Sequence, residues 1–367
     1  MTTSAKSRLR IVIAKKLVST VGGSESFARA LDRELRARGH EVSLVGLQTA
    51  WTRDGMTEAA NLSLLPVRFG RVGAAIDALL PTTLVGDDRL RRAVAGADVV
   101  HSIAREWAGA LSRAARAEGV AFVETPLVHP GQLFSGAGVG DVARYRRDDA
   151  VIALTEWEAT WYRERRVTNV HVTGIGPNIT ALPEVPRDPA TILFVGRKER
   201  YKGYHALREA AHYVWRERPD AVFVAIGQPA WYARFSRAPE DPRWIERDVV
   251  SEAEKAEAFA RATIFAMPSE HETFGHTYLE AWSAGLPVIA GDIAPLREVV
   301  REGVDGVHAR NHPIAIADAI LALLRAPDRA RWMGVQGRER VLREFTWPIV
   351  ATRTELAYES ARARARR

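Results

Sequence analysis

Two glutamates that lie eight positions apart, Glu272 and Glu280, are the residues of this chain best placed to do chemistry. An apolar run that ends at Pro268 predicts a buried strand, and the spacing after Gly275 predicts a helix over 278–284. Free N–H groups at a helix N-terminus bind phosphate, and nearby carboxylates accept hydrogen bonds from sugar hydroxyls. The pattern therefore favours a sugar-nucleotide site over the alternative, an ordinary strand–loop–helix unit with solvated glutamates.

Two cations form a second group further upstream. An apolar run over 191–195 predicts a buried parallel strand, and Gly196-Arg197 and then Lys202-Gly203 follow it. In open α/β sheets ligands collect at the carboxyl ends of strands, where an arginine fork and a lysine can together neutralise a diphosphate. The chain contains only six lysines, so Lys202 is hard to explain as one of many surface cations. The pair favours a diphosphate site over a solvated loop.

Taken together, these motifs resemble glycosyltransferase family 4, the retaining enzymes of GT-B fold that use nucleotide sugars. The resemblance extends over nearly the whole chain. The segments that carry it are 22–25, Leu31 and 38–42 near the N-terminus, 194–197 with Lys202-Gly203, Glu272 with Glu280, Phe274-Gly275, 279–281 and 285–288.

The resemblance implies a role for each of these residues. Arg197 and Lys202 would bind the donor diphosphate and stabilise the charge of the leaving phosphate, and Glu280 would accept hydrogen bonds from the ribose. Glu272 would hold the transferred sugar together with backbone N–H groups. The residues implied at the donor nucleotide and its phosphates are Gly196, Phe274, Gly275, His276, Thr277 and Glu280.

Retention in this family is described as front-face attack, in which the departing phosphate oxygen takes the proton of the acceptor. No side-chain base is then required. His129 follows the fourth predicted strand, where family members carry a histidine near the anomeric centre; a loop histidine beside Pro130 is the alternative. His101 resembles the first histidine of a family H-x-H pattern, but Ile103 replaces the second, so a satisfied core histidine is an equal alternative.

Glycines also mark the first strand–helix turn. Gly22 and Gly23 lack side chains, which lets backbone amides approach a phosphate or an acceptor hydroxyl, although no G-x-G-x-x-G fingerprint is formed. Lys15 and Lys16 precede this turn. Contact with the acceptor is one interpretation of the two lysines, and exposed loop charges are the favoured one.

Predicted strands and helices alternate twice along the 367 residues, and a looser stretch over 174–189 separates the two series. We therefore expect an α/β protein of two Rossmann-like, doubly wound domains, which the resemblance implies face each other across a cleft. The expected domains are 1–180, for the acceptor, and 181–347, for the donor, with a C-terminal helix over 348–367 that crosses back to the first. The predicted strands are 10–14, 41–46, 99–101, 121–124 and 151–154, then 191–195, 222–226, 263–267 and 287–290.

The formal charge of +7 arises from arginines spread over most segments, often beside an acid, and not from one basic stripe with aromatics. We therefore expect no nucleic-acid partner. Peripheral contact with an anionic membrane is one interpretation of the arginines around 74–80, and an ordinary amphipathic helix is the favoured one. These arginines are Arg68, Arg71, Arg89, Arg91 and Arg92.

The chain has no cysteine, no apolar leader segment and no run of about twenty apolar residues. These features predict a soluble, cytoplasmic protein, with peripheral contact at the inner face of the membrane as the further interpretation. No Asp-x-Asp tripeptide occurs, so we expect no catalytic metal and no cofactor besides the sugar nucleotide.

Three classes of function are compatible with the sequence. A retaining hexosyltransferase that transfers sugar to a hydroxyl acceptor is favoured. An epimerase or phosphorylase of the same architecture, and a binding protein without catalysis, are the alternatives. The sequence leaves open the base, the sugar, the linkage, the oligomeric state and the acceptor, which the loops over 51–71 and 131–141 are expected to bind.

Overall fold

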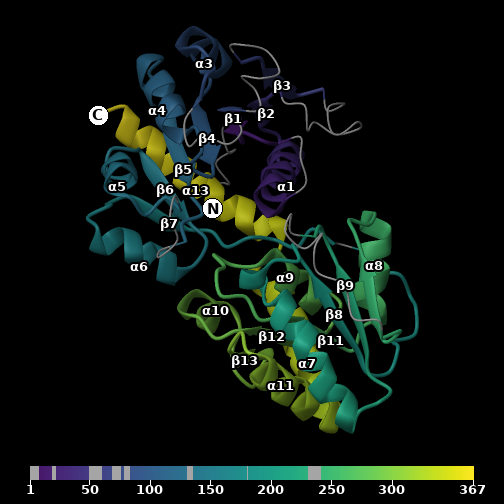
Figure 1. The fold of residues 1–367 in the computed structure, drawn as a ribbon. Coiled ribbons are helices and arrows are strands. Elements are labelled where there is room, and N and C mark those ends of the chain that lie inside the picture. The colour runs from purple at the N-terminus through teal and green to yellow at the C-terminus, as the bar shows by residue number, and fades with distance from the viewer. Residues whose placement is uncertain are drawn as a thin grey trace, which may run out of the picture. The chain divides into compact units, whose positions relative to one another are not determined.

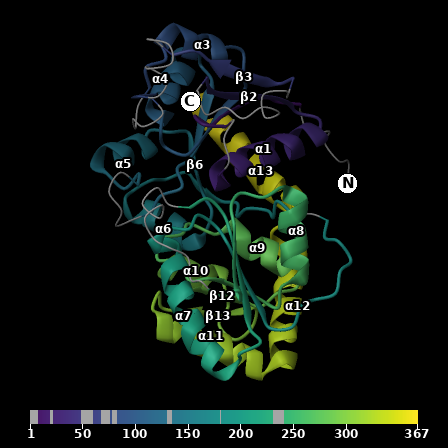
Figure 2. The ribbon, with the colours of Figure 1, turned by 45° about the vertical axis from the view of Figure 1, so that its right-hand side comes forward.

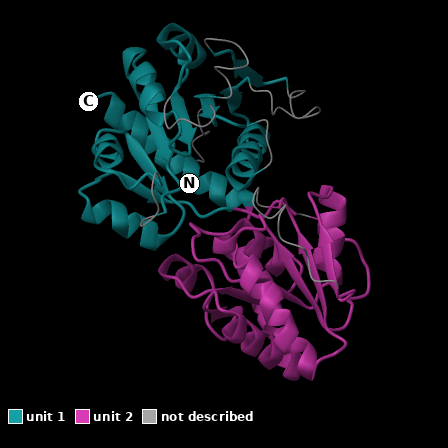
Figure 3. Cartoon of the chain, in the orientation of Figure 1, with its two compact units in different colours: residues 1–175, 347–367 teal, residues 176–346 magenta. Residues whose placement is uncertain are grey.

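The computed structural model describes residues 8–18, 22–48, 60–67, 76–77, 83–129, 135–179, 181–229 and 241–367. The chain forms two compact units, shown in different colours in Figure 3. The N-terminal unit contains Met1–Ile175 together with Trp347–Arg367, and the C-terminal unit contains Gly176–Thr346. Among the described residues, no helix is long and apolar enough to cross a membrane.

In the N-terminal unit the described residues form a seven-stranded sheet in the order β3-β2-β1-β4-β5-β6-β7 (Figure 1). Every strand pair is parallel, and β1 lies between β2 and β4, where the strand order reverses. The strands are β1 Arg10–Ala14, β2 Glu41–Leu47, β3 Leu62–Leu65, β4 Val99–Ile103, β5 Ala121–Thr125, β6 Ala150–Ala153 and β7 Val170–Val172.

Helices cover both faces of this sheet. Helices α3 and α4 pack together over one face, where alternate strand residues such as Val12, Ala14 and Val100 join their core. The C-terminal helix α13 packs on β5, β6 and α1. The helices of this unit are α1 Gly23–Ala37, α3 Asp87–Val94, α4 Ala108–Ala117, α5 Val139–Tyr145, α6 Glu156–Glu164 and α13 Trp347–Ala365.

Glu124 of β5 and Asp148 just before β6 are two of the buried acids of this unit. Arg144 donates two hydrogen bonds to Glu124, at 2.9 and 3.0 Å, and the Ser112 hydroxyl donates one to Asp148 at 3.0 Å. Burial, reinforced by the charge of Glu124, raises the pKa of Asp148 to about 9. Asp148 is therefore neutral at physiological pH, and its carboxyl group donates a hydrogen bond to Glu124.

The proton on Asp148 makes the free energy of unfolding depend on pH. An aspartate of the unfolded chain titrates near pH 4, so the stabilisation by Asp148 is complete below about pH 4 and is lost as the pH rises towards about 9. We expect Asp148→Asn, whose amide donates at every pH, to raise Tm by about 3 °C or more at pH 8 and by less at pH 5. Differential scanning calorimetry checks this, with Asp88→Asn on exposed α3 as the control. A Tm difference that stays constant from pH 5 to pH 9 would contradict it.

The C-terminal unit contains a parallel sheet of six strands among the described residues, in the order β10-β9-β8-β11-β12-β13. Its strand order reverses between β8 and β11, which are neighbours. Open sheets of this kind bind ligands at that point, outside the carboxyl ends of the strands. The strands are β8 Thr191–Val195, β9 Val222–Ile226, β10 Trp244–Arg247, β11 Ile264–Met267, β12 Val288–Gly291 and β13 Gly306–Ala309.

Helices α7 and α11 pack against each other and on the sheet of this unit, while α9 packs with α12 (Figure 2). The 3₁₀ helix η1 leads into α7. The bounds are η1 Arg200–Lys202, α7 Tyr204–Glu217, α8 Glu252–Arg261, α9 His276–Ser283, α10 Ala294–Val299, α11 Pro313–Arg325 and α12 Pro327–Glu344.

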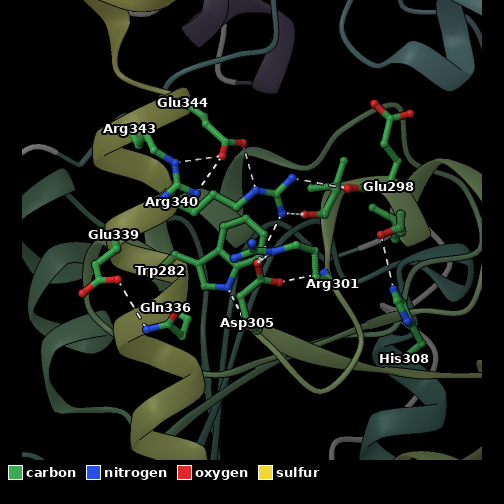
Figure 4. A network of polar contacts seen from close by, with 12 residues as sticks. Trp282, Glu298, Arg301, Asp305, His308, Gln336, Glu339, Arg340, Arg343 and Glu344 are labelled. Carbon is green, nitrogen blue, oxygen red and sulfur yellow. Dashed lines mark hydrogen bonds and ion pairs between the residues drawn. The ribbon is translucent and has the colours of Figure 1, made fainter.

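A buried polar network fixes α9 to the rest of its unit (Figure 4). The indole of Trp282 in α9 donates to the carbonyl oxygen of Asp305 at 2.8 Å, and the fully buried Asp305 carboxylate receives Arg301 at 2.6 Å. Arg340 of α12 donates to Asp305 at 3.3 Å and to the carbonyl oxygen of Val299 at 2.6 Å. Because every member has a partner, the network holds the helix that begins next to Glu272 in one position.

The structure confirms the predicted α/β class with two parallel sheets, and it corrects parts of the sequence prediction. Helix α9 begins at His276, two residues earlier than predicted, and α13 is Trp347–Ala365 where a helix over 348–367 was predicted. The prediction missed the strands β3, β7, β10 and β13.

Candidate functional site

The reversal between β8 and β11 brings the loops that follow these strands into contact. Gly203, directly after Lys202, has a φ of +79°, and a Cβ atom there would lie 2.6 Å from Pro268 Cγ. The Glu270 amide also donates to the carbonyl oxygen of Tyr201 at 2.7 Å. A glycine is therefore required at 203 to let the lysine loop approach the glutamate loop.

This approach joins the predicted cations to the first glutamate. The Lys202 ammonium forms an ion pair and hydrogen bond with Glu272, and their side chains are 15% and 11% exposed. Arg197 donates to the Tyr201 hydroxyl, and its guanidinium and the Lys202 ammonium lie 5.5 and 5.3 Å from the Tyr201 ring centroid. Two cations thus flank one aromatic ring, which is an arrangement suited to an anionic ligand.

The N-terminus of α9 follows Glu272 directly. Gly275 precedes the helix with a φ of +90°, and a Cβ atom there would meet the Tyr278 ring at 2.5 Å. The N-cap residue is this glycine, which has no side chain to cap the helix. His276 is the first helical residue; burial lowers its pKa to about 4, while Glu272 opposes the shift and Lys255 adds to it. The imidazole is therefore neutral at physiological pH, and its Nε2 has no hydrogen-bond partner among the described residues.

Glu280 lies on the same helix and is 1% exposed. Its Oε1 lies 3.2 Å from the ammonium of Lys255, which comes from α8. Burial raises the pKa of Glu280, and the Lys255 cation opposes that rise. Among the described residues, Oε2 of Glu280 is a buried oxygen without a hydrogen-bond partner. A ligand hydroxyl is the kind of group that would satisfy it.

Contacts bring Arg197 and Lys202 together at Tyr201, join Lys202 to Glu272, and join Lys255 to Glu280. His276 is near enough to Glu272 and Lys255 for both charges to shift its pKa. We call these groups the donor cluster. The other predicted donor residues contribute differently. Phe274 is buried against Phe345, so only its backbone can face a ligand. The Thr277 hydroxyl approaches the Met267 sulfur at 3.5 Å, and Gly196 follows β8 directly.

Sequence reasoning missed Lys255, whose only signal was the scarcity of lysine. It also missed a second polar group, at the ends of β8 and β10. There Glu246 receives Lys198 at 3.2 Å, the Trp244 indole at 3.0 Å and the Tyr204 hydroxyl. Residues 244–247 form strand β10, and this polar cluster fixes it to the loop that carries Arg197.

In the N-terminal unit, Gly22 and Gly23 lie at the start of α1, as predicted, but a carboxylate already occupies that position. A Cβ atom on Gly22 would lie 2.2 Å from Glu25 Oε2, and Lys15 forms an ion pair with Glu25 at 3.1 Å. A second anion at this helix end would be repelled by Glu25. The assignment of Gly22 and Gly23 to an acceptor or phosphate loop stays a prediction.

The interpretation of Lys15 and Lys16 as exposed loop charges was wrong. Both are buried, with exposures of 1% and 0%. Lys15 also contacts Glu106 at 3.0 Å, and Lys16 pairs with Asp77 at 2.9 Å. Each lysine is tolerated in the interior because a carboxylate compensates its charge.

The two histidines that the sequence singled out in this unit differ. His101 is fully buried, with Nδ1 2.9 Å from the Tyr358 hydroxyl and Nε2 2.7 Å from Thr125 Oγ1. Burial lowers the pKa of His101 to about 3, so it is a satisfied, neutral core histidine. His129 is partly exposed, and its carbonyl oxygen receives the Ser135 hydroxyl at 2.5 Å. Its predicted place near the anomeric centre stays a prediction.

Some predictions fall outside the described residues. Arg68, Arg71, most of 74–80, most of the loop 51–71 and residues 131–134 belong to this group. Of the described members of the arginine group, Arg89 donates to the carbonyl oxygen of Pro66 at 2.8 Å and Arg91 contacts Glu118 at 2.7 Å.

Comparison with known proteins gives two family matches that meet at the predicted boundary region. The model described as Glycosyltransferase Family 4 matches residues 21–180, and the one described as Glycosyl transferases group 1 matches residues 179–340. The chain belongs to glycosyltransferase family 4. The family predicted from the sequence motifs is thereby confirmed.

Relatives within and around this family are similar to parts or to all of the chain. Alpha-maltose-1-phosphate synthase of Mycolicibacterium smegmatis is 31% identical over 205 residues, 51% of this chain and 53% of that protein. The alignment thus covers about half of the length of this relative.

Two solved structures share the GT-B fold over 96% of this chain. Sucrose-phosphate synthase from Thermosynechococcus elongatus has a TM-score of 0.75, 18% identity and 98% of its own chain covered. Anabaena HepE with UDP and glucose has a TM-score of 0.76, 13% identity and 100% covered.

Proposed function

We propose that this chain is a retaining glycosyltransferase that moves a hexosyl unit from a nucleoside-diphosphate sugar to a hydroxyl acceptor without a divalent metal. The observation that carries the proposal is the contact of Arg197, Lys202 and Glu272 next to α9, the helix that also carries the buried Glu280. Family membership and the name of the M. smegmatis relative, a sugar-phosphate synthase, support it. The solved relative with bound UDP and glucose supports a nucleotide sugar as the donor.

The cluster has the chemistry that such a donor requires. The diphosphate would lie between Arg197, Lys202 and the N–H groups at the start of α9, and Oε2 of Glu280 would accept a ribose hydroxyl. Binding of phosphate by Lys202 would release Glu272 from its ion pair, which leaves that carboxylate to accept hydroxyls of the transferred sugar.

The same groups would act in the reaction itself. As the bond between the anomeric carbon and the phosphate oxygen breaks, negative charge grows on that oxygen, and Lys202 and Arg197 would stabilise it. In front-face transfer this oxygen takes the proton of the acceptor hydroxyl, so no side-chain base is needed. We assign acceptor binding to the N-terminal unit, which contains His129.

Thermal-shift measurements with UDP-glucose, GDP-mannose and ADP-glucose test donor binding first. We expect one of these sugar nucleotides, at millimolar concentration, to raise the Tm of the protein by several degrees, because a ligand that binds only the folded state stabilises that state. Transfer to an acceptor panel in excess EDTA then tests the reaction. Formation of an epimerised sugar nucleotide would favour an epimerase, and a requirement for free phosphate would favour a phosphorylase. Binding without turnover would favour a binding protein. Each of these results would contradict the proposal. Loss of transfer in EDTA would contradict its metal-free part.

The cellular location follows the same proposal. We place the enzyme in the cytoplasm, where sugar nucleotides are made, with peripheral contact at an anionic membrane as the further prediction. Sedimentation of the protein with vesicles that contain anionic lipid would test that contact, and no sedimentation at low salt would rule it out.

A further inference from the structure

The further inference concerns Lys255, which the sequence motifs do not include. Its side chain is 15% exposed and lies between two carboxylates, Glu252 at 2.8 Å and Glu280 at 3.2 Å. Glu252 is 76% exposed on the same helix, whereas Glu280 is buried on α9. The lysine therefore connects α8 to the one deeply buried carboxylate of the donor cluster.

The two oxygens of Glu280 have different environments. Lys255 contacts Oε1, while Oε2 is buried and has no hydrogen bond of ordinary geometry to any described residue. A carboxylate carries its charge in the interior only when a cation compensates it, and an oxygen left without a donor there is costly. The arrangement thus compensates the charge at one oxygen and leaves the other for a ligand.

We propose that Lys255 is a positioning residue of the donor site, which holds Glu280 ionised and turned so that Oε2 meets the ribose of the nucleotide sugar. This inference rests on the proposed function, because it assigns the ribose to Glu280. Lys255 acts on the ribose through Glu280, which it contacts at Oε1.

The charged and titratable groups around Glu280 support this role. Lys255 and Glu252 face it from α8, and the uncharged amide of Asn178, from the segment before β8, is a further donor that favours its ionised form. On α9 itself, His276 is near Lys255 and is neutral because burial lowers its pKa. Burial raises the pKa of Glu280, Lys255 is the main group that opposes the rise, and Glu252 adds to it. Without Lys255, the pKa of Glu280 would therefore rise further, which favours the protonated acid.

The test measures donor binding to Lys255→Met by calorimetry from pH 6 to pH 8.5, with the sugar nucleotide that the wild type binds best among UDP-glucose, GDP-mannose and ADP-glucose. The charge of these donors does not change in this pH range, so the pH dependence of the ratio of the variant Kd to the wild-type Kd reports only the titration of groups on the protein. We expect this ratio to be about tenfold larger at pH 6 than at pH 8.5, because a protonated Glu280 accepts the ribose hydroxyls more weakly than its carboxylate does. Lys255→Arg, which keeps the charge, should remain within about threefold of the wild type at every pH.

The same measurement with the 2′,3′-dideoxy form of that nucleotide separates this role from a general one. We expect the wild type and Lys255→Met to bind the dideoxy ligand equally and without the added pH dependence. A Kd ratio independent of pH, or a loss of affinity that persists with the dideoxy ligand, would overturn the inference. Lys255→Gln replaces the methionine variant if that protein does not fold. If the wild type binds no sugar nucleotide, the proposed function itself fails instead.

Discussion

Replacement of Lys202 by alanine should lower kcat for sugar transfer by about 10²–10³-fold, the range found when one preorganised electrostatic contact to a developing anion is removed. Lys202 is the partly buried cation of the donor cluster, and its present partner is the Glu272 carboxylate. Arg197→Ala should also remove most of the turnover, because Arg197 is the second cation assigned to the diphosphate. Arg197 is 61% exposed and contacts Tyr201 and Glu199, so its loss should perturb the fold less than the loss of Lys202. Initial rates at saturating donor and acceptor measure both effects.

Arg325→Ala is the matched control for these two variants. Arg325 is 61% exposed at the end of α11, and it pairs with an exposed glutamate, Glu217. Its loss should change kcat by less than about twofold, since exposed ion pairs contribute little. If Lys202→Ala kept its Tm and retained turnover within about threefold of the wild type, the assignment of the diphosphate to Lys202 would be wrong.

Glu280→Ala should raise the Kd for the nucleotide sugar by about 10–100-fold. Hydrogen bonds to a charged group contribute about 1.5–3 kcal/mol each, and the buried Oε2 is the acceptor that the ribose would use. The substitution also leaves Lys255 without its buried partner, so Tm is measured on the same samples. Calorimetric titration gives the affinity directly.

Glu257→Ala on α8 controls for the loss of a glutamate, because Glu257 is 48% exposed and pairs with Arg261 at the surface. It should bind donor with the wild-type affinity. If a folded Glu280→Ala protein bound the donor as tightly as the wild type, the assignment of the ribose to Glu280 would be wrong. The proposed role of Lys255 would then fail as well.

Central strands were predictable because they are apolar along their whole length. The predicted bounds of β1, β8 and β9 agree with the structure, since each is a short hydrophobic run between polar loops. Strands at or near sheet edges were missed. Residues 244–247 form β10, but only Trp244 is buried, so the segment has the composition of a loop.

Within the candidate site, the sequence predicted those residues that follow strands of known order. Glu272, Glu280 and Lys202 could be placed because strand ends converge at the reversal point of the sheet. Partners from other helices could not be placed, because no pattern within α8 indicates that Lys255 meets Glu280. The same reason explains the error at Lys15 and Lys16, whose compensating carboxylates lie at positions 25, 106 and 77.

A crystal structure with the nucleoside diphosphate of the preferred donor tests the central claim most directly. The account predicts that the Lys202 ammonium leaves Glu272 for the diphosphate, that the phosphate oxygens receive N–H groups from the start of α9, and that Glu280 Oε2 lies within about 3 Å of a ribose hydroxyl. A nucleotide bound elsewhere, or one whose phosphates point away from Lys202 while Glu280 stays without a ligand contact, would contradict it.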